Sequence, residues 1–262
     1  MKVEKGVTLI FGPNGSGKST LISIMEGLLP PTSGTIYVLG LSPERYSREI
    51  MNRVAFLPER PQYFGSNNVA DYLYWIMNIG RADKSNMKRL IDRFDIEYLI
   101  NRSFSQLSLG EMQLVSLVAV LSLDRQYFVL DELNANLDPS RRIVLSTEIA
   151  MMKKNGKSFL ISTHIIDELI SIVDRTIIMS KGSVKKSLIN KPGESGNQFS
   201  LYISSTNSDM LMDSLNALNP KRYGDFVVVD GHNIASIMKI LNDVERESLI
   251  SAFSYPRMTF DE

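Results

Sequence analysis

The sequence predicts an α/β fold built on a mostly parallel sheet with helices on both faces. Apolar strand-like runs alternate with helix-like stretches over roughly the first 190 residues, which is typical of successive βαβ units. Residues 127–130 are apolar throughout, as expected for a central strand buried on both faces. A glycine-rich segment joins the first expected strand to the first expected helix. We expect strands at 7–11, 35–39, 54–57, 127–130, 158–162 and 175–180, and helices at 18–29, 69–79, 87–94, 111–122, 139–154 and 165–172.

A polar stretch rich in glycine and proline interrupts this rhythm at residues 190–197, and it predicts a linker. We therefore expect one large domain over 1–189 and a small accessory βαβαβ module over 198–262. The strands of this module are expected at 199–204, 226–230 and 248–255, and its helices at 209–218 and 234–244.

Composition excludes several classes of protein. Basic and acidic residues both number 29, so net charge gives no support for a nucleic-acid partner or an anionic membrane surface. The chain has no cysteine, which excludes disulfides and thiolate metal sites and fits a reducing cytoplasm. The longest apolar stretch, near 115–121, is far shorter than the roughly 20 residues that a membrane-spanning helix needs.

The glycine-rich segment matches the phosphate-binding pattern G-x-x-x-x-G-K-[ST] at every fixed position. Glycines let backbone N–H groups close around phosphate oxygens, and the following helix N-terminus adds partial positive charge. Lys18 can reach the terminal phosphates, and the Ser19 hydroxyl can ligate Mg2+. A glycine-rich turn that binds nothing is the alternative. The motif predicts a P-loop NTPase, with phosphate-binding residues Gly12, Pro13, Asn14, Gly15, Ser16, Gly17, Lys18, Ser19 and Thr20.

Two carboxylates, Asp131 and Glu132, directly follow the apolar strand expected at 127–130. Such a strand end can hold magnesium beside a bound nucleotide. We expect Asp131 to ligate the ion and Glu132 to orient and deprotonate the attacking water. The alternative is that the two carboxylates only end a strand and cap a turn.

The segment 107–113, which reads LSLGEMQ, resembles the LSGGQ signature of the ATP-binding subunits of ABC transporters. Segments 54–59, 136–138 and 162–164 resemble the Q-loop region, the end of the D-loop and the switch histidine of the same family. The resemblance covers most of residues 1–188. It implies a P-loop ATPase with a helical signature subdomain, using ATP and Mg2+. The C-terminal module resembles the short extension of exporter ATPase subunits.

This resemblance implies that two ATPase subunits pack head to tail, as a homodimer or a pair of related chains. Each ATP would lie between Lys18 of one subunit and Ser108 with Gly110 of the other. Glu132 would activate water and His164 would contact the γ-phosphate. The implied across-dimer residues are Ser108, Gly110, Glu111 and Asp138, and the implied magnesium ligands are Ser19, Asp131 and Glu59.

Local structure offers another interpretation of the same residues. Ser108 and Glu111 form a capping-box pattern for the helix that follows. Asp138 followed by Pro139 is a typical helix start. A lone histidine such as His164 is more often an ordinary structural residue.

The chain departs from the family pattern at several positions. Leu109 replaces a glycine of the signature and Glu111 replaces its glutamine, and we expect both to weaken the dimer without preventing it. Glu59 stands where the family often has glutamine, with Gln62 close by. An aromatic residue that would stack on adenine is missing before the loop, as are the first antiparallel strands. We therefore expect either a start upstream of this sequence or a shortened N-terminus. We also expect an exposed edge at 35–39 and weak, base-indifferent nucleotide binding.

The function expected from these observations is an ATP-hydrolysing subunit that powers a separate membrane-spanning permease. We expect an exporter, with this subunit peripheral on the cytoplasmic face of the membrane and no nucleic-acid partner. The aromatic segment 69–79 could receive a helix of the permease, although the pattern favours a buried amphipathic helix, since aromatic residues lie mostly in the core. The alternatives are a soluble non-transport ABC ATPase and a degenerate nucleotide-binding regulatory module.

Overall fold

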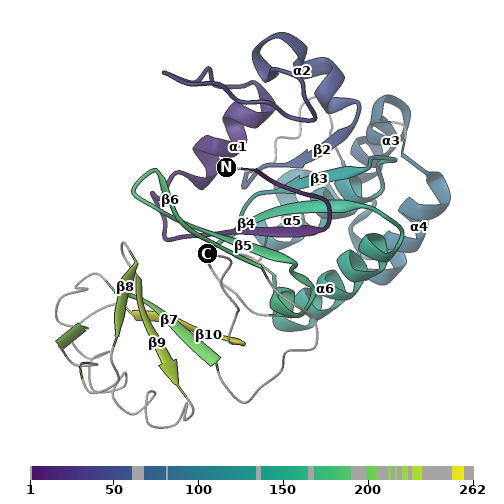
Figure 1. Cartoon of the computed structure of the whole chain (residues 1–262). Helices are drawn as coiled ribbons and strands as arrows, with labels where there is room; N and C mark the ends of the chain where they lie inside the picture. Colours follow the sequence, from purple (N-terminus) through teal and green to yellow (C-terminus); the bar gives the residue numbers. More distant parts are fainter. Residues whose placement is uncertain are drawn as a thin grey trace. The chain divides into compact units, whose positions relative to one another are not determined.

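The mostly parallel sheet that the sequence predicts is the framework of the protein (Figure 1). A computed structural model describes residues 2–60, 68–80, 82–133, 137–164, 168–189, 199–205, 212–213, 216, 220–223, 226–231 and 250–256. Within these residues the sheet has six strands, in the order β2-β3-β4-β1-β5-β6. These strands are β1 (Val7–Phe11), β2 (Val54–Leu57), β3 (Tyr127–Leu130), β4 (Ser158–Thr163), β5 (Arg175–Ser180) and β6 (Ser183–Ile189).

The chain divides into two compact units. The larger unit comprises Lys2–Val7 and Ser19–Thr163, and the smaller one comprises Thr8–Lys18 and the chain from His164. In the larger unit β2, β3 and β4 pair in parallel, with Leu57 opposite Leu130 and Leu130 opposite Ile161. The described helices include α1 (Lys18–Glu26), α2 (Pro43–Met51), α3 (Val69–Gly80), α4 (Lys84–Arg93), α5 (Leu109–Leu121) and α6 (Pro139–Lys154).

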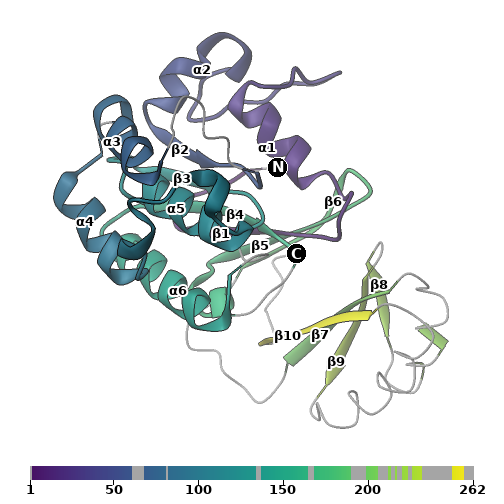
Figure 2. The ribbon, with the colours of Figure 1, turned by 180° about the vertical axis from the view of Figure 1, so that it is seen from behind.

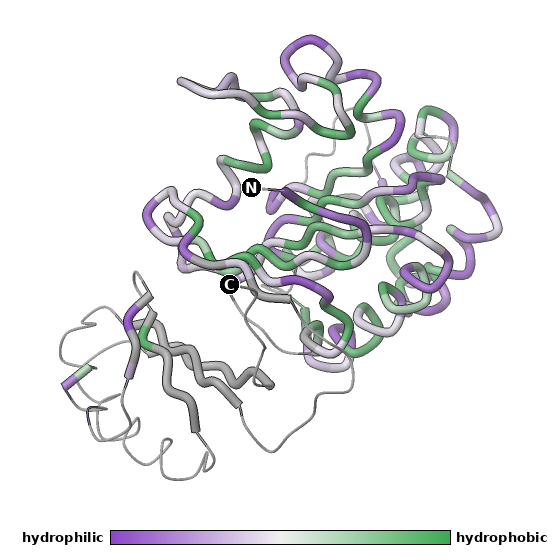
Figure 3. The backbone as a smooth tube through the Cα atoms, viewed as in Figure 1, coloured by the Kyte–Doolittle hydropathy of each residue, from purple (hydrophilic) through white to green (hydrophobic). Residues whose placement is uncertain are grey.

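Helix α5 is the buried centre of the larger unit. Every residue from Gln113 to Leu121 is buried, because this helix is apolar on almost all sides. It packs against α3, α4 and β2. Helices α3 to α6 gather beside β2, β3 and β4 in both views (Figures 1 and 2). Figure 3 shows hydrophobic stretches along the strands and inner helices of this unit, whereas the connecting loops are mostly hydrophilic.

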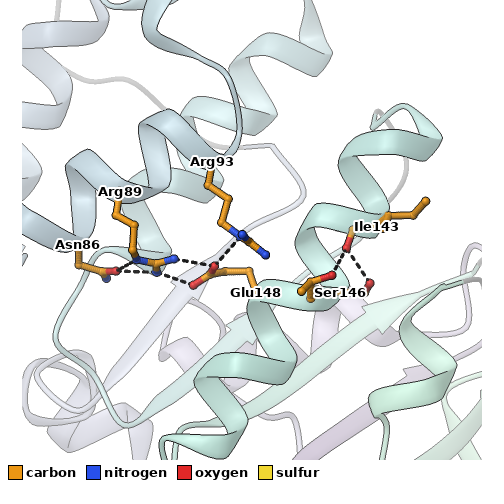
Figure 4. Close-up of polar contacts among 7 residues, drawn as sticks. Asn86, Arg89, Arg93, Ile143, Ser146 and Glu148 are labelled. Carbon is orange, nitrogen blue, oxygen red and sulfur yellow. Dashed lines mark hydrogen bonds and ion pairs between the residues drawn. The ribbon is translucent and has the colours of Figure 1, made fainter.

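An ion cluster around a buried glutamate joins α4 to α6 (Figure 4). Glu148 of α6 is fully buried, and its carboxylate accepts from Arg89 at 2.6 and 2.9 Å. Arg93, one turn further along α4, lies 3.1 Å from the same carboxylate. Asn86 accepts from the Arg89 guanidinium at 2.8 Å and so fixes its orientation. Both arginines come from the surface of α4, so the cluster sets the position of α4 relative to α6.

We expect Glu148→Ala to lower the free energy of unfolding by about 1–3 kcal/mol. The substitution leaves two guanidinium groups without their carboxylate, although their partial exposure lets water replace part of the loss. Urea denaturation measures the effect. Asp92→Asn, on the exposed side of α4, is the control and should change stability by less than about 0.5 kcal/mol. Equal stability of both variants would contradict a stabilising role for this cluster.

The smaller unit combines three strands of the main sheet with a second sheet. Strand β1 pairs with β5 in parallel, and β5 pairs with β6 in antiparallel fashion. The second sheet is antiparallel, in the order β10-β7-β9-β8. The strands expected at 199–204, 226–230 and 248–255 correspond to β7 (Phe199–Ser205), β9 (Phe226–Gly231) and β10 (Ile250–Pro256). The sequence did not predict β8 (Lys221–Tyr223) or β6.

Part of the C-terminal prediction lies outside the described residues. This applies to the linker at 190–197 and the helix at 234–244, and to most of the helix at 209–218. The helix expected at 165–172 begins outside the described residues and continues as a 3-10 turn, Glu168–Ile172. Within the described residues, no helix is long and apolar enough to cross a membrane.

The prediction of a strand at 35–39 is wrong. Val38 and Leu41 exchange backbone hydrogen bonds of 2.8 and 3.0 Å across a two-residue turn. Leu39 and Gly40, the two central residues, both have positive φ, at 53° and 80°. This is the conformation of a type I′ turn, and it prevents an extended strand through residue 39.

Helix α1 ends at Glu26, three residues earlier than predicted. Gly27 has a φ of 81°, its N–H donates to Ile24 at 3.1 Å, and the Leu28 N–H donates to Ser23 at 2.9 Å. This pair of bonds forms a Schellman motif, which places glycine in the left-handed region after a helix. The sequence also missed α2, which begins at Pro43, a residue well suited to the first turn of a helix.

Candidate functional site

The glycine-rich loop has the strand and helix that its motif requires. Every residue of β1 is buried, and the chain turns through the loop into α1, which begins at Lys18. Lys18 is only 4% exposed, and its Nζ donates to the carbonyl oxygens of Gly12 at 2.8 Å and Pro13 at 3.3 Å. The ammonium group is therefore held back over its own loop, where it can meet a phosphate group.

Three features of the loop fit a bound phosphate. A β-carbon on Gly12 would overlap the Met179 carbonyl oxygen and approach the Ser16 Oγ to 2.7 Å, so the close packing of the loop requires glycine. Gly17 has a φ of 97°, which side-chain-bearing residues rarely adopt. The Ser16 Oγ is buried and has no hydrogen-bond partner in the described structure. A buried hydroxyl without a partner is costly unless a ligand satisfies it.

The acidic strand end is held by both neighbouring strands. The Asp131 N–H donates to the Leu57 carbonyl at 2.8 Å, and its carboxylate accepts from the Ser162 Oγ. The Glu132 N–H donates to both the carbonyl and the Oγ of Ser162, at 3.1 and 3.2 Å. Both acids are almost fully buried. His164 directly follows β4 and is half-buried.

Glu132 has a φ of 47°, in the left-handed region that non-glycine residues seldom occupy. Backbone outliers of this kind persist only where surrounding bonds impose them, and they cluster at active sites. The two bonds to Ser162 supply that restraint. The outlier therefore supports a functional role for Glu132.

The donor set suits magnesium. The Asp131 carboxylate is one candidate magnesium ligand, and the hydroxyl of Ser19 on α1 is another. Across the part of the chain that the structure describes, no group of three or more acidic or histidine side chains could hold a metal ion. Mg2+ needs no such group, because it uses one or two carboxylates together with substrate phosphates and water. Glu59 lies on an exposed bend after β2, and Gln62 lies outside the described residues.

Glu26, at the end of α1, is a buried acid that sequence reasoning missed. Burial, and to a smaller extent the charge of Asp131, raises the pKa of the Glu26 carboxyl from 4.5 to about 7. No local pattern distinguishes it from an ordinary helical glutamate. Its electrostatic interaction with Asp131, more than 100 positions further along the chain, arises only in the folded protein.

The pKa of Glu26 predicts a pH dependence of stability. The folded state binds the proton of the Glu26 carboxyl more tightly than the unfolded chain does. The contribution of Glu26 to the free energy of unfolding is therefore largest below about pH 4.5. It should fall as the pH rises from about 4.5 to about 7, and then level off. Glu26→Gln should remove this slope and stabilise the protein at pH 8 by up to about 3 kcal/mol.

Denaturation across this pH range in EDTA, without nucleotide, measures the effect of Glu26. Glu49→Gln, an exposed acid of α2, is the control and should keep the wild-type slope. A Glu26→Gln variant with the wild-type pH dependence would contradict the prediction.

The signature segment forms the capping box that its sequence indicates. The Ser108 Oγ accepts from the Glu111 N–H at 3.2 Å, and the Glu111 carboxylate accepts from the Ser108 N–H at 2.8 Å. Helix α5 begins at the next residue, Leu109, whose side chain is 72% exposed. The negative charge of Glu111 is thus directed back onto the helix start.

Asp138 also has the predicted local role. It caps α6 by accepting from the Arg141 N–H at 3.0 Å, and Pro139 is the first residue of the helix. The Arg141 Nε lies 3.4 Å from its other carboxylate oxygen. Asn136, which belongs to the same family motif, lies outside the described residues.

A phosphate loop between a buried strand and a helix, with a second strand ending in two acids, defines a P-loop ATPase. The family model described as ABC transporter matches residues 1–135. The energy-coupling factor transporter ATP-binding protein EcfA1 of Mycoplasma mobile is 31% identical over 185 residues, covering 68% of this chain and 67% of that protein. The chain belongs to the ABC transporter family and is an ATP-binding ATPase subunit.

Solved structures share the fold. An ATP-binding subunit of an ABC transporter matches with a TM-score of 0.64 at 21% identity, covering 92% of this chain and 88% of the other. The bacterial ABC transporter cassette MJ0796, in a dimeric structure, matches with a TM-score of 0.64 at 19% identity, covering 73% of this chain and 88% of that one. These likenesses establish the P-loop fold with its flanking helices.

Proposed function

We propose that this chain forms a head-to-tail dimer that hydrolyses ATP at two composite sites. The phosphate loop of one subunit would hold the triphosphate, and Ser108 with Gly110 of the other subunit would complete the site. The observation that carries nucleotide binding at the loop is the buried Ser16 hydroxyl, which has no hydrogen-bond partner among the described residues, in a loop too close-packed for any residue but glycine at position 12. The dimeric cassette of similar fold supports the arrangement.

Each acidic and basic group has a distinct role in this proposal. Lys18 neutralises the terminal phosphates, and Asp131 with Ser19 holds Mg2+, with Glu59 as a further ligand. The ion would supply charge neutralisation on the phosphate oxygens. Glu132 takes the proton of the attacking water, and its buried, backbone-restrained position suits a general base. His164 contacts the γ-phosphate, and Asp138 completes the interface.

Hydrolysis would drive a separate membrane-spanning subunit, with this chain peripheral on the cytoplasmic face. Helix α3 supports such docking, because Tyr74, Trp75 and Ile79 are 49–66% exposed while Val69 and Tyr72 are buried. A helix with one apolar side in the core and another in solvent suits a partner. We also propose the export direction, and an accessory module over 198–262 after a linker at 190–197.

Magnesium-dependent ATP hydrolysis across a protein concentration series tests the composite site. Activity should rise more steeply than in proportion to protein concentration, because only the dimer has complete sites. Strictly proportional activity would mean that one subunit suffices. Bound nucleotide without turnover at any concentration would favour a degenerate nucleotide-binding module. The exposed Leu109, which replaces a glycine of the signature, is the observation that favours this alternative.

A further inference from the structure

The Glu111 carboxylate is held by more than its capping box. Its Oε2 accepts from the Ser108 N–H at 2.8 Å. Its Oε1 accepts from the Tyr98 hydroxyl at 3.4 Å and lies 3.7 Å from the Arg102 Nη1. The Arg102 guanidinium also lies over the Tyr98 ring, 5.3 Å from its centroid. Tyr98, Arg102, Ser108 and Glu111 together form what we call the signature cluster.

Arg102 is placed by its backbone as well as by Glu111. Its carbonyl accepts from the Val69 N–H at 3.0 Å, at the start of α3. The next residue, Ser103, forms a bridge with Asn68. The main chain on which Arg102 sits is therefore fixed, while its side chain remains 46% exposed. A fixed backbone and an exposed guanidinium suit a group that acts at an interface.

The charge of Glu111 conflicts with the proposed role of Ser108. A carboxylate beside Ser108 repels the phosphate that this helix start would bind in the partner's site. The bonds with Ser108, and to a smaller extent the charge of Arg102, hold the pKa of the Glu111 carboxyl below its usual range. The carboxylate is therefore ionised near neutral pH, and the repulsion has to be neutralised in another way.

We propose that Arg102, supported by Tyr98, is a positioning residue of the composite site that neutralises Glu111 and holds it on the Ser108 N–H. This proposal rests on the proposed function. By keeping the carboxylate turned back onto its own helix, Arg102 leaves the Ser108 hydroxyl side of the helix start open to the partner's ATP. The departure of Glu111 from the usual glutamine is thereby compensated within the same subunit.

The other interpretation is an ordinary surface ion pair. Exposed pairs contribute little to folding, so removing this one would have almost no effect on any property. A positioning role makes a different prediction, because the effect of Arg102 should depend on the charge at position 111. That dependence can be measured with a double-mutant cycle.

ATP-driven dimerisation in the Glu132→Gln background is the primary measurement, since blocked hydrolysis lets ATP-bound dimers accumulate. Sedimentation velocity in Mg-ATP gives the dimer Kd. Arg102→Ala should raise this Kd about three- to tenfold. When position 111 is already glutamine, the same Arg102→Ala substitution should change the dimer Kd less than about twofold, because glutamine completes the capping box without a charge. Arg48→Ala, an exposed arginine of α2, is the matched control and should have no effect.

A second readout uses chains with Glu132 intact. Arg102→Ala should raise the protein concentration that gives half-maximal ATPase activity and leave kcat at saturation unchanged. The melting temperature should stay within about 1–2 °C of the wild type, as for an exposed pair. A lower kcat with unchanged concentration dependence would overturn the positioning role.

The outcomes separate this inference from the proposed function. If the Glu132→Gln reference binds nucleotide but forms no ATP-dependent dimer, both are overturned. If the reference dimerises and Arg102→Ala has no effect, only the inference is overturned. If Arg102→Ala weakens the dimer equally with glutamate or glutamine at position 111, Arg102 acts directly on the partner and not through Glu111, which also overturns it.

Discussion

Glu132→Gln should reduce ATP turnover by about 100-fold or more while ATP binding stays within about twofold of the wild type. Glutamine keeps the size of the side chain and cannot accept a proton from water. The backbone restraint should persist, because both hydrogen bonds to Ser162 come from the Glu132 N–H and not from its side chain. The substitution therefore separates proton transfer from the geometry of the strand end.

Single-turnover ATP hydrolysis and equilibrium binding of a fluorescent ATP analogue measure these two quantities. Glu44→Gln, an exposed acid of α2, is the control for the loss of one negative charge and should leave turnover unchanged. Asp131→Asn should instead weaken magnesium-dependent binding. An unchanged hydrolysis rate in Glu132→Gln would show that another group is the base.

Gly12→Ala should weaken ATP binding at least about tenfold, which corresponds to about 1.4 kcal/mol of binding free energy. The added β-carbon would overlap the Met179 carbonyl oxygen and crowd the Ser16 Oγ at 2.7 Å. Backbone cannot move aside as a flexible side chain can, so the loop itself has to shift. Its N–H groups would then miss the phosphate oxygens that they are expected to bind.

Gly34→Ala separates this steric effect from the ordinary cost of replacing a glycine. Gly34 has a φ of 79°, and a β-carbon there would meet no atom of the described residues within 4 Å. It should lower stability by about 1 kcal/mol through its backbone conformation alone, with ATP affinity unchanged. Isothermal titration calorimetry with both variants checks the contrast. Equal ATP affinity in Gly12→Ala and the wild type would show that the loop tolerates the larger residue.

The segments that indicate the chemistry of this protein are short and continuous in the chain, so their local structure was predictable. The phosphate loop and the pair Asp131 and Glu132 are recognised from residue types at adjacent positions. Strands β1 and β3 are recognised as runs of apolar residues. The capping box at Ser108 is equally local, because its partners are three residues apart. The type I′ turn at Leu39 was missed, because leucine there occupies a positive φ that asparagine, aspartate or glycine normally takes in such a turn.

The order of residues along the chain was sufficient for the fold class, the phosphate loop and the acidic strand end, since each depends on neighbours in sequence. Only the folded chain decided which distant groups meet. Ser162 bonds to Asp131 across 31 positions, and Arg89 reaches Glu148 across 59. Arg102 and Tyr98 became relevant to the signature only through their contacts with Glu111. The physical reason is that such pairs form when separate apolar surfaces pack together, and no local pattern encodes that packing.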